Sequence, residues 1–288
     1  MFFSGISDEA GQAIDDQIKA HEELGWEYLE LRLVDGIPIL DLPLSKVIKI
    51  ARQLKQAGIT VSNLASKIGD WSRPITGDFS LDIIDLYAAA ACMDILEMPE
   101  RRIRVMSWPN DPKNPVSEAD WRREAIRRMR ELANIAGDLR ITLAHENCSG
   151  YGGISVENNV ALLEAMAAYS AFKVLFDTGN APAHGKNSWK WYQAVRKDIG
   201  YVHIKDAKIL DPDKPEIYTY PGDGDGYVEE IIQDLLTKGY DGGFSIEPHL
   251  AAVVHTGQKA DSEEELYKSY VEYGRRLMAL VAKIQTAH

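Results

Sequence analysis

The regular alternation of short apolar segments with longer amphipathic ones constrains the fold of this chain more than any other sequence feature. The short segments are apolar, several are rich in β-branched residues, and they indicate buried strands; the longer ones follow the helical period. Strands that are each followed by a helix form parallel sheets. The expected strands are residues 2–6, 28–32, 59–65, 103–107, 141–146, 173–177, 201–205 and 243–247, and the expected helices are residues 12–24, 44–57, 81–96, 118–136, 156–167, 189–197, 227–238 and 263–284.

Eight strand–helix units in 288 residues predict an α/β fold, a (β/α)8 TIM barrel, as a single domain spanning residues 1–288. An open, doubly wound sheet is the alternative for this alternation. Such a sheet usually carries a Gly-rich phosphate-binding turn after its first strand. The segment GISDEAGQ at residues 5–12 lacks that pattern, and no linker marks a second domain.

Capping residues set several of the expected helix ends. Ser117 and Ser155 precede two of the helices as N-caps, because a serine side chain accepts hydrogen bonds from the first free N–H groups. Gly25, Gly58 and Gly137 follow three of them as C-caps, because glycine adopts the left-handed conformation that ends a helix.

The charge balance favours a small-molecule partner over nucleic acid. With 32 basic and 44 acidic side chains the formal net charge is −12, and such a chain repels phosphate backbones. No apolar run is long enough to cross a membrane. The two cysteines, Cys92 and Cys148, and the lack of a secretory signal in residues 1–12 predict a reduced, cytoplasmic setting. The amphipathic helix around residues 267–280 is a candidate surface for homo-oligomer formation.

Four consecutive strands in the second half of the chain each end on one acidic or imidazole side chain. In a parallel barrel, side chains alternate in and out along each strand, and neighbouring strands lie about 4.8 Å apart. The carboxyl ends of these strands form the usual active-site face, so the four groups are expected to converge. The residues are Glu146 in LAHENC, Asp177 in LFDTGN, His203 in VHIKD and Glu247 in FSIEPH.

A divalent metal ion explains how three carboxylates and an imidazole can share one site. Carboxylates packed together repel one another and would otherwise bind protons, whereas a cation removes that repulsion. The ligand set favours Mn²⁺, with Mg²⁺ or Co²⁺ as alternatives, over zinc. Taken singly, each residue has a simpler explanation: a solvated carboxylate, a hydrogen-bonded core histidine or a turn. Their coincidence on four consecutive strands favours the metal site.

The same segments resemble a known family. Their motifs are similar to those of the xylose isomerase-like TIM-barrel superfamily, in the branch of sugar phosphate isomerases and epimerases that includes ketose 3-epimerases and inosose dehydratase. HIKD is a specific match, whereas IEP or FDT alone would be weak. The resemblance covers essentially the whole chain and implies that the four strand-end residues bind one divalent metal, usually Mn²⁺. The motifs are residues 144–147, 176–179, 203–206 and 245–249.

Three further residues are candidates for substrate contact. Lys205 shares its strand parity with His203, and His249 with Glu247, so both are expected to face the same cavity. Trp108 follows the fourth strand and is a candidate apolar wall beneath a sugar ring. The alternatives are an ion pair with a nearby carboxylate for Lys205, a loop cap for His249 and rim packing for Trp108.

One position departs from the family pattern. The resemblance implies a substrate-contacting histidine three residues after the metal-binding aspartate, but Asn180 stands there. His184 lies four residues further along and is the candidate to replace it.

The expected function is that of a metal-dependent sugar isomerase or epimerase. Glu146 and Glu247 would act as the acid and base that move a proton on the carbon next to a carbonyl of a ketose or oxo-sugar, through an enediolate. If a leaving group lies β to the carbonyl, the same enediolate expels it. The protein would then be a lyase or dehydratase acting on a 3-oxo-glycoside or inosose, and Asn180 keeps this alternative open. A non-catalytic sugar-binding barrel is the third interpretation.

Overall fold

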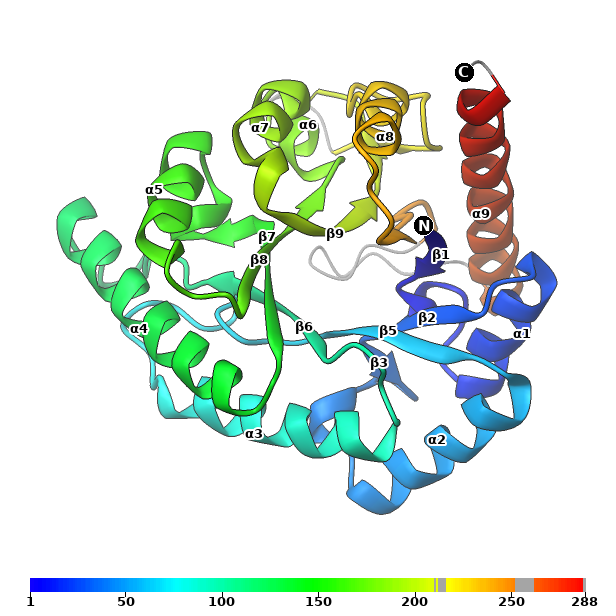
Figure 1. The fold of residues 1–288 in the computed structure, drawn as a ribbon, viewed down its shortest axis with the longest axis horizontal. Helices are drawn as coiled ribbons and strands as arrows, with labels where there is room; N and C mark the ends of the chain where they lie inside the picture. The colour runs from blue at the N-terminus through cyan, green and yellow to red at the C-terminus, as the bar shows by residue number, and fades with distance from the viewer. Residues whose placement is uncertain (210, 212–215, 252–261, 287–288) are drawn as a thin grey trace.

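A barrel of eight parallel strands forms the centre of the molecule, with the helices around it (Figure 1). The computed structural model describes residues 1–209, 211, 216–251 and 262–286. The barrel strands are β1 Phe2–Gly5, β2 Tyr28–Leu31, β5 Thr60–Ala65, β6 Arg102–Ser107, β7 Thr142–Gly150, β8 Phe172–Asp177, β9 Ile199–Ile204 and β12 Gly243–Ile246. Neighbours follow the order β1-β12-β9-β8-β7-β6-β5-β2, and a parallel bridge between Ile6 and Glu30 joins the two ends. The predicted (β/α)8 barrel is confirmed.

Apolar faces of the surrounding helices pack on the outside of the strands. Two hydrophobic clusters fill this layer, one under the helices of each half of the chain. Helices α1 and α9 lie side by side, which brings the two ends of the barrel sequence together (Figure 1). The helices are α1 Ile14–Leu24, α2 Leu44–Ala57, α3 Ser80–Ile95, α4 Glu118–Asp138, α5 Val156–Met166, α6 Asn180–Ala183, α7 Ser188–Val195, α8 Val228–Thr237 and α9 Glu263–Thr286.

The predicted helix caps are partly confirmed. Ser117 and Ser155 accept hydrogen bonds from the N–H groups three residues later, at 3.2 and 3.1 Å. The prediction that Gly137 ends α4 is wrong, because the helix continues through it. Arg140 instead takes the left-handed conformation, with φ of +56°, and the N–H of Ile141 closes the end by bonding to Ala136.

Two short hairpins extend the loops that follow β2 and β9, and the alternation pattern did not predict them. They are β3 Leu33–Val34 with β4 Ile37–Pro38, and β10 Asp206–Ala207 with β11 Tyr218–Thr219. The buried carboxylate of Asp206 organises the Gly-rich turn after the second hairpin. It accepts hydrogen bonds from the N–H groups of Gly222, Gly224 and Gly226, each at 2.9 Å. The GDGDG sequence is therefore a turn built on one aspartate.

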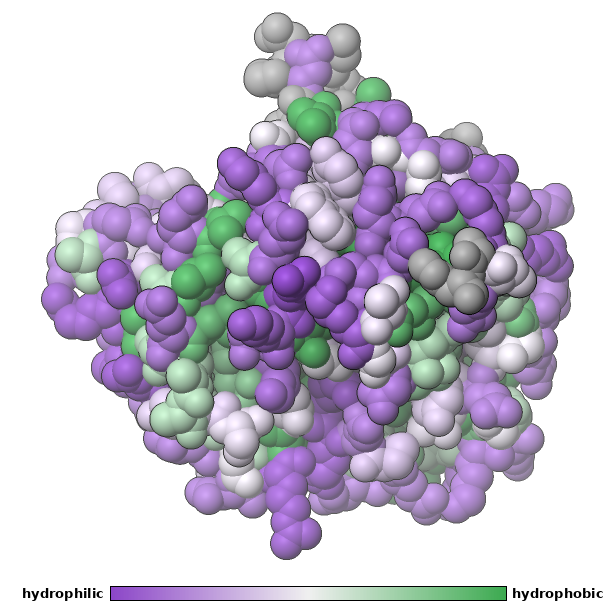
Figure 2. Space-filling model, turned by 45° about the horizontal axis from the view of Figure 1, so that its top comes forward, coloured by the Kyte–Doolittle hydropathy of each residue, from purple (hydrophilic) through white to green (hydrophobic). Residues whose placement is uncertain are grey.

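Hydrophilic side chains dominate the face of the molecule shown in Figure 2, and its apolar areas are small and interrupted. In the part of the chain that the structure describes, no helix has both the length and the apolar character needed to cross a bilayer.

Candidate metal centre and active site

The interior of the barrel changes from apolar to ionisable toward the carboxyl ends of the strands. Ala144, Leu175 and Tyr201 pack together inside the barrel. The residue two positions further along a strand faces the same way. In β7, β8 and β9 those residues are Glu146, Asp177 and His203.

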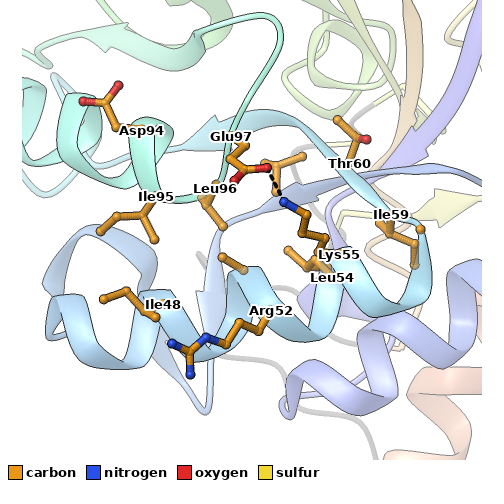
Figure 3. Close-up of a pocket in the computed structure, with 13 residues that line it drawn as sticks. Ile48, Arg52, Leu54, Lys55, Ile59, Thr60, Asp94, Ile95, Leu96 and Glu97 are labelled. Atoms are coloured by element: carbon orange, nitrogen blue, oxygen red, sulfur yellow. Dashed lines mark hydrogen bonds and ion pairs between the residues drawn. The ribbon is translucent and has the colours of Figure 1, made fainter.

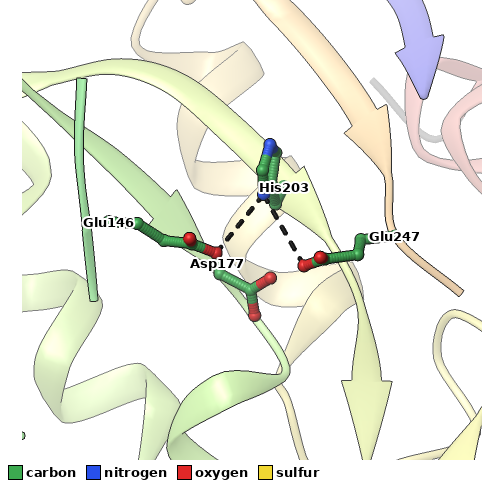
Figure 4. A group of neighbouring side chains, drawn as sticks. All are labelled: Glu146, Asp177, His203 and Glu247. Carbon is green, nitrogen blue, oxygen red and sulfur yellow. Dashed lines mark ion pairs between the residues drawn. The ribbon is translucent and has the colours of Figure 1, made fainter. Parts of the chain in front are cut away.

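Four side chains from four neighbouring strands point toward one centre (Figure 4). The ligand atoms of Glu146, Asp177, His203 and Glu247 all lie within 4.8 Å of one another, and all four residues are buried. Three of their atoms, Glu146 Oε2, Asp177 Oδ2 and His203 Nδ1, are buried and make no hydrogen bond of normal geometry. Their contacts are ion pairs, from Arg104 to Glu146 Oε2 at 3.6 Å, from Lys205 to Asp177 Oδ2 at 3.2 Å, and between Glu146 Oε1 and His203 Nδ1 at 3.4 Å. These atoms are available to ligate a cation.

A buried carboxylate behind the cluster orients His203. Glu30 Oε2 lies 3.0 Å from Nε2 of the imidazole, which directs Nδ1 toward the centre of the cluster. Glu30 is itself held by hydrogen bonds from Asn63 Nδ2 at 2.8 Å and Ser245 Oγ at 2.9 Å. Carboxylate partners of this kind fix the ring of a metal-binding histidine and raise its basicity.

Side-chain clamps position Asp177 at the end of β8. The side-chain amide of Asn147 bonds to the N–H and C=O of Asp177, at 2.7 and 2.9 Å. Oδ1 of the Asp177 carboxylate accepts hydrogen bonds from the N–H groups of Gly179 and Asn180, at 2.8 and 2.7 Å. The other oxygen, Oδ2, is left facing the cluster.

Cations surround the other side of the site. The Arg32 guanidinium contacts Asp8 at 2.9 Å, Glu9 at 3.3 Å and Glu247 at 3.2 Å. Glu9 in turn lies 2.9 Å from Nδ1 of His249. Through these contacts Arg32 and Glu9 position Glu247 and connect it to His249, in the loop that precedes α9.

The electrostatics of the cluster suit ligands of a cation. Burial opposes a charged imidazole, but Glu30 and Glu146 together outweigh it and raise the pKa of His203 to about 10. Burial raises the pKa of Asp177 to about 6. Burial would also raise the pKa of Glu247, but neighbouring cations, Lys205 foremost, hold it well below its ordinary value. Bound protons and the Lys205 ammonium therefore supply positive charge beside these carboxylates. A bound metal ion could supply that charge in their place.

A cavity of about 210 Å³ opens beside the cluster. Pockets for drug-sized ligands usually measure about 300–1,000 Å³, so this smaller cavity suits a correspondingly small molecule. Most of the residues that line it have polar or charged side chains, and they present both polar and apolar atoms to the cavity. The lining residues are Arg32, Trp71, Arg104, Met106, Glu146, Cys148, Ser149, Asn180, His184, Lys205, Tyr218, Glu247 and His249.

Four of the five candidate substrate contacts line this cavity: Lys205, His249, Asn180 and His184. Trp108 does not. Its indole is fully buried, Nε1 donates to Asp82 at 2.8 Å, and its backbone has a φ of +53° that turns the side chain toward α3. It packs between the barrel and the helices and offers no surface to a substrate.

Several residues of the site escaped sequence reasoning. Glu30 and Arg32 belong to an early strand and its loop, and Arg104 lies on β6 with its guanidinium 3.6 Å from Glu146. A signal was present, because Glu30 and Arg104 interrupt otherwise apolar strands. Its meaning depended on knowing that β6 lies beside β7 and that β2 closes the barrel against the end of β1.

A larger hollow lies elsewhere, between the C-terminal ends of α2 and α3 and the start of β5 (Figure 3). Its volume is about 620 Å³, and an ion pair of 2.8 Å between Lys55 and Glu97 crosses it. It lies at the amino end of the strands, the face of a TIM barrel that serves stability, and its lining holds no cluster of metal ligands.

The fold and the cluster of carboxylates and histidine define a (β/α)8 barrel with a site suited to a metal ion. Residues 18–277 match the xylose isomerase-like TIM barrel family, and the chain belongs to that family.

Three proteins are similar to this chain in sequence or in structure. A stretch of 144 residues is 29% identical to inosose dehydratase of Bacillus licheniformis; it covers 46% of this chain and 47% of that protein, so the match spans about half of the curated relative. D-psicose 3-epimerase, solved in the presence of D-fructose, superposes with a TM-score of 0.72 at 16% identity and 99% coverage of both chains. The IOLI protein with a bound zinc atom has a TM-score of 0.73 at 14% identity, again with 99% coverage of both. The two structures support the fold.

Proposed function

We propose that this protein is a divalent-metal-dependent sugar isomerase or epimerase that removes a proton from the carbon next to a carbonyl of a ketose or oxo-sugar. The observation that carries the proposal is the convergence of four buried ligands, three of them with atoms that make no hydrogen bond, beside a cavity of monosaccharide size. Membership of the xylose isomerase-like family and the likeness to an epimerase structure support it.

The donor set fits Mn²⁺, with Mg²⁺ or Co²⁺ as alternatives, because three carboxylates and one imidazole are available. When bound, the ion supplies a Lewis acid for negative charge that develops on the substrate oxygens. Glu146 and Glu247 approach the cluster from opposite sides (Figure 4) and both line the cavity. One carboxylate takes the proton from carbon and the other returns a proton to the opposite face, which inverts the stereocentre.

A lyase or dehydratase is the second candidate, and two observations favour it. Asn180, with its amide 3.3 Å from Glu146 Oε1, occupies the position where the family resemblance implies a histidine. The curated relative is an inosose dehydratase. In this reaction the same proton is removed, and a hydroxyl or alkoxide β to the carbonyl leaves in place of reprotonation.

The test is turnover in D₂O with Mn²⁺ on a panel of ketoses, 3-oxo-sugars and inososes, followed by NMR and mass spectrometry. An epimeric product carrying deuterium supports the epimerase, and loss of water or an alcohol supports the lyase. No exchange or turnover on any substrate, by protein shown to contain metal, would point to a non-catalytic sugar-binding barrel.

Glu247→Gln is expected to lower turnover by about 10²- to 10⁴-fold, because it removes a proton-transfer group and weakens a ligand. Glu164→Gln, which changes an exposed glutamate on α5, is the matched control and should behave as wild type. Full turnover by the Glu247 variant would sink the proposed role of this carboxylate.

A further inference from the structure

The ammonium group of Lys205 lies among the metal ligands themselves. Its Nζ donates to Glu247 Oε2 at 2.7 Å and forms an ion pair with Asp177 Oδ2 at 3.2 Å. Lys205 is only 2% exposed and yet lines the cavity. A monovalent cation thus contacts two of the four residues that would hold the divalent ion.

The two residues that follow β8, Thr178 and Gly179, position Lys205. Thr178 Oγ1 donates to the carbonyl of Lys205 at 2.6 Å and lies 3.2 Å from its N–H, which fixes the backbone. The side chain then crosses Gly179, where a Cβ would come within 2.6 Å of the lysine Cγ. The Thr-Gly pair after Asp177 therefore makes the close passage of this side chain possible.

Lys205 differs from the arginine that also contacts Glu247. Arg32 is anchored by Asp8 and Glu9 in addition to Glu247, so its planar guanidinium cannot leave without breaking several ion pairs. The ion-pair partners of the Lys205 ammonium are ligands of the cluster, Glu247 and Asp177. A lysine ammonium is carried on a flexible four-carbon stem, and Lys205 lines the adjoining cavity.

We propose that Lys205 is an exchangeable counter-cation of the metal site: its ammonium group neutralises Glu247 and Asp177 while metal is absent and moves into the cavity when a divalent ion binds. The inference rests on the proposed metal-dependent function. A divalent ion and an ammonium group that share the same carboxylates repel each other, so binding of one displaces the other. In the metal-loaded protein the three N–H donors of Lys205 face the substrate space.

The first experiment compares metal binding by full-length, metal-stripped wild type, Lys205→Met and the control Lys208→Met, with Mn²⁺ as the titrant in a calorimeter. Methionine matches the length of the lysine stem without its charge, and Lys208 is a half-exposed lysine three residues along the chain. We expect Lys205→Met to bind Mn²⁺ about tenfold more tightly than wild type and to melt at a lower temperature without metal. The control should match wild type in both.

A second measurement uses the wild-type protein alone, so it does not depend on the folding of a variant. Lysines are acetylated for a short time with and without Mn²⁺, and each site is quantified by mass spectrometry. Displacement predicts that Mn²⁺ increases the labelling of Lys205 severalfold relative to Lys208. Labelling of Lys205 that Mn²⁺ leaves unchanged or lowers would overturn the inference.

The outcomes separate this inference from the proposed function. Wild type that binds no Mn²⁺, Mg²⁺ or Co²⁺ would overturn the metal-dependent function and the exchange with it. Wild type that binds Mn²⁺, together with a folded Lys205→Met that binds it equally or more weakly, would overturn only the exchange, because Lys205 would then be a residue that organises the ligands.

Discussion

At the level of single residues, the site depends on groups that never touch the proposed metal. Glu30 is the clearest case, since it is fully buried and bonded to His203, Asn63 and Ser245. An imidazole that can rotate, or that presents the wrong nitrogen, is a poor ligand. The carboxylate of Glu30 prevents both, because it holds Nε2 and leaves Nδ1 for the cluster.

We therefore expect Glu30→Gln to weaken Mn²⁺ binding by about 10- to 100-fold, the usual effect of removing such a partner. The amide keeps the shape of the side chain but loses the charge that makes His203 basic. Calorimetric titration measures the change, and Glu27→Gln, an exposed glutamate just before the same strand, is the control. Equal affinities in the Glu30 variant and wild type would show that His203 does not need this carboxylate.

At the level of elements, a buried histidine joins the first and last helices to the barrel. His21 on α1 places its ring nitrogens 2.8 Å from the carbonyl of Tyr28 on β2 and 2.8 Å from the hydroxyl of Tyr270 on α9. Burial lowers the pKa of His21 to about 4. The folded protein therefore keeps this imidazole neutral in conditions where an unfolded chain protonates it.

This contact predicts acid destabilisation. Because the folded pKa of His21 lies below the unfolded value of about 6.5, its contribution to stability is complete above pH 6.5 and is lost as the pH falls toward 4. The loss should approach about 3 kcal/mol, since one pKa unit corresponds to about 1.4 kcal/mol. Urea unfolding of metal-stripped wild type and His21→Gln at pH 7, 6 and 5 measures it. The variant should show a shallower decline; parallel declines would contradict the assignment.

At the level of the whole molecule, the barrel gathers ligands that are far apart along the chain. Glu146, Asp177, His203 and Glu247 come from β7, β8, β9 and the end of β12, and no two of them are close in sequence. An unfolded chain cannot present them together. Metal should therefore bind the folded state alone and stabilise the whole barrel.

Mn²⁺ at about 100 times its dissociation constant should stabilise the protein by about 2.7 kcal/mol. For a chain of this size that corresponds to a melting temperature higher by roughly 4–5 °C. Thermal unfolding with Mn²⁺ and again after excess EDTA checks the prediction. Asp177→Asn should lose most of the rise; if that variant and wild type gain the same, the ion acts somewhere else.

Much of the fold and part of the site could be predicted from the sequence, because both follow from periodicity within single elements. Apolar strands and amphipathic helices repeat eight times, and parity along β9 placed Lys205 on the face of His203. The predicted end of a helix was wrong where a residue other than glycine takes the left-handed conformation, as Arg140 does after α4.

Sequence by itself determined the barrel and the convergence of four strand-end ligands, since strand parity and the common direction of parallel strands are local properties. Only the tertiary structure decided which residues surround them. Closure of β1 against β2 brings Glu30 behind His203 and Arg32 behind Glu247, while a left-handed turn at Trp108 removes that residue from the cavity. Such contacts depend on barrel closure, register and backbone direction between distant segments, and no local pattern encodes them.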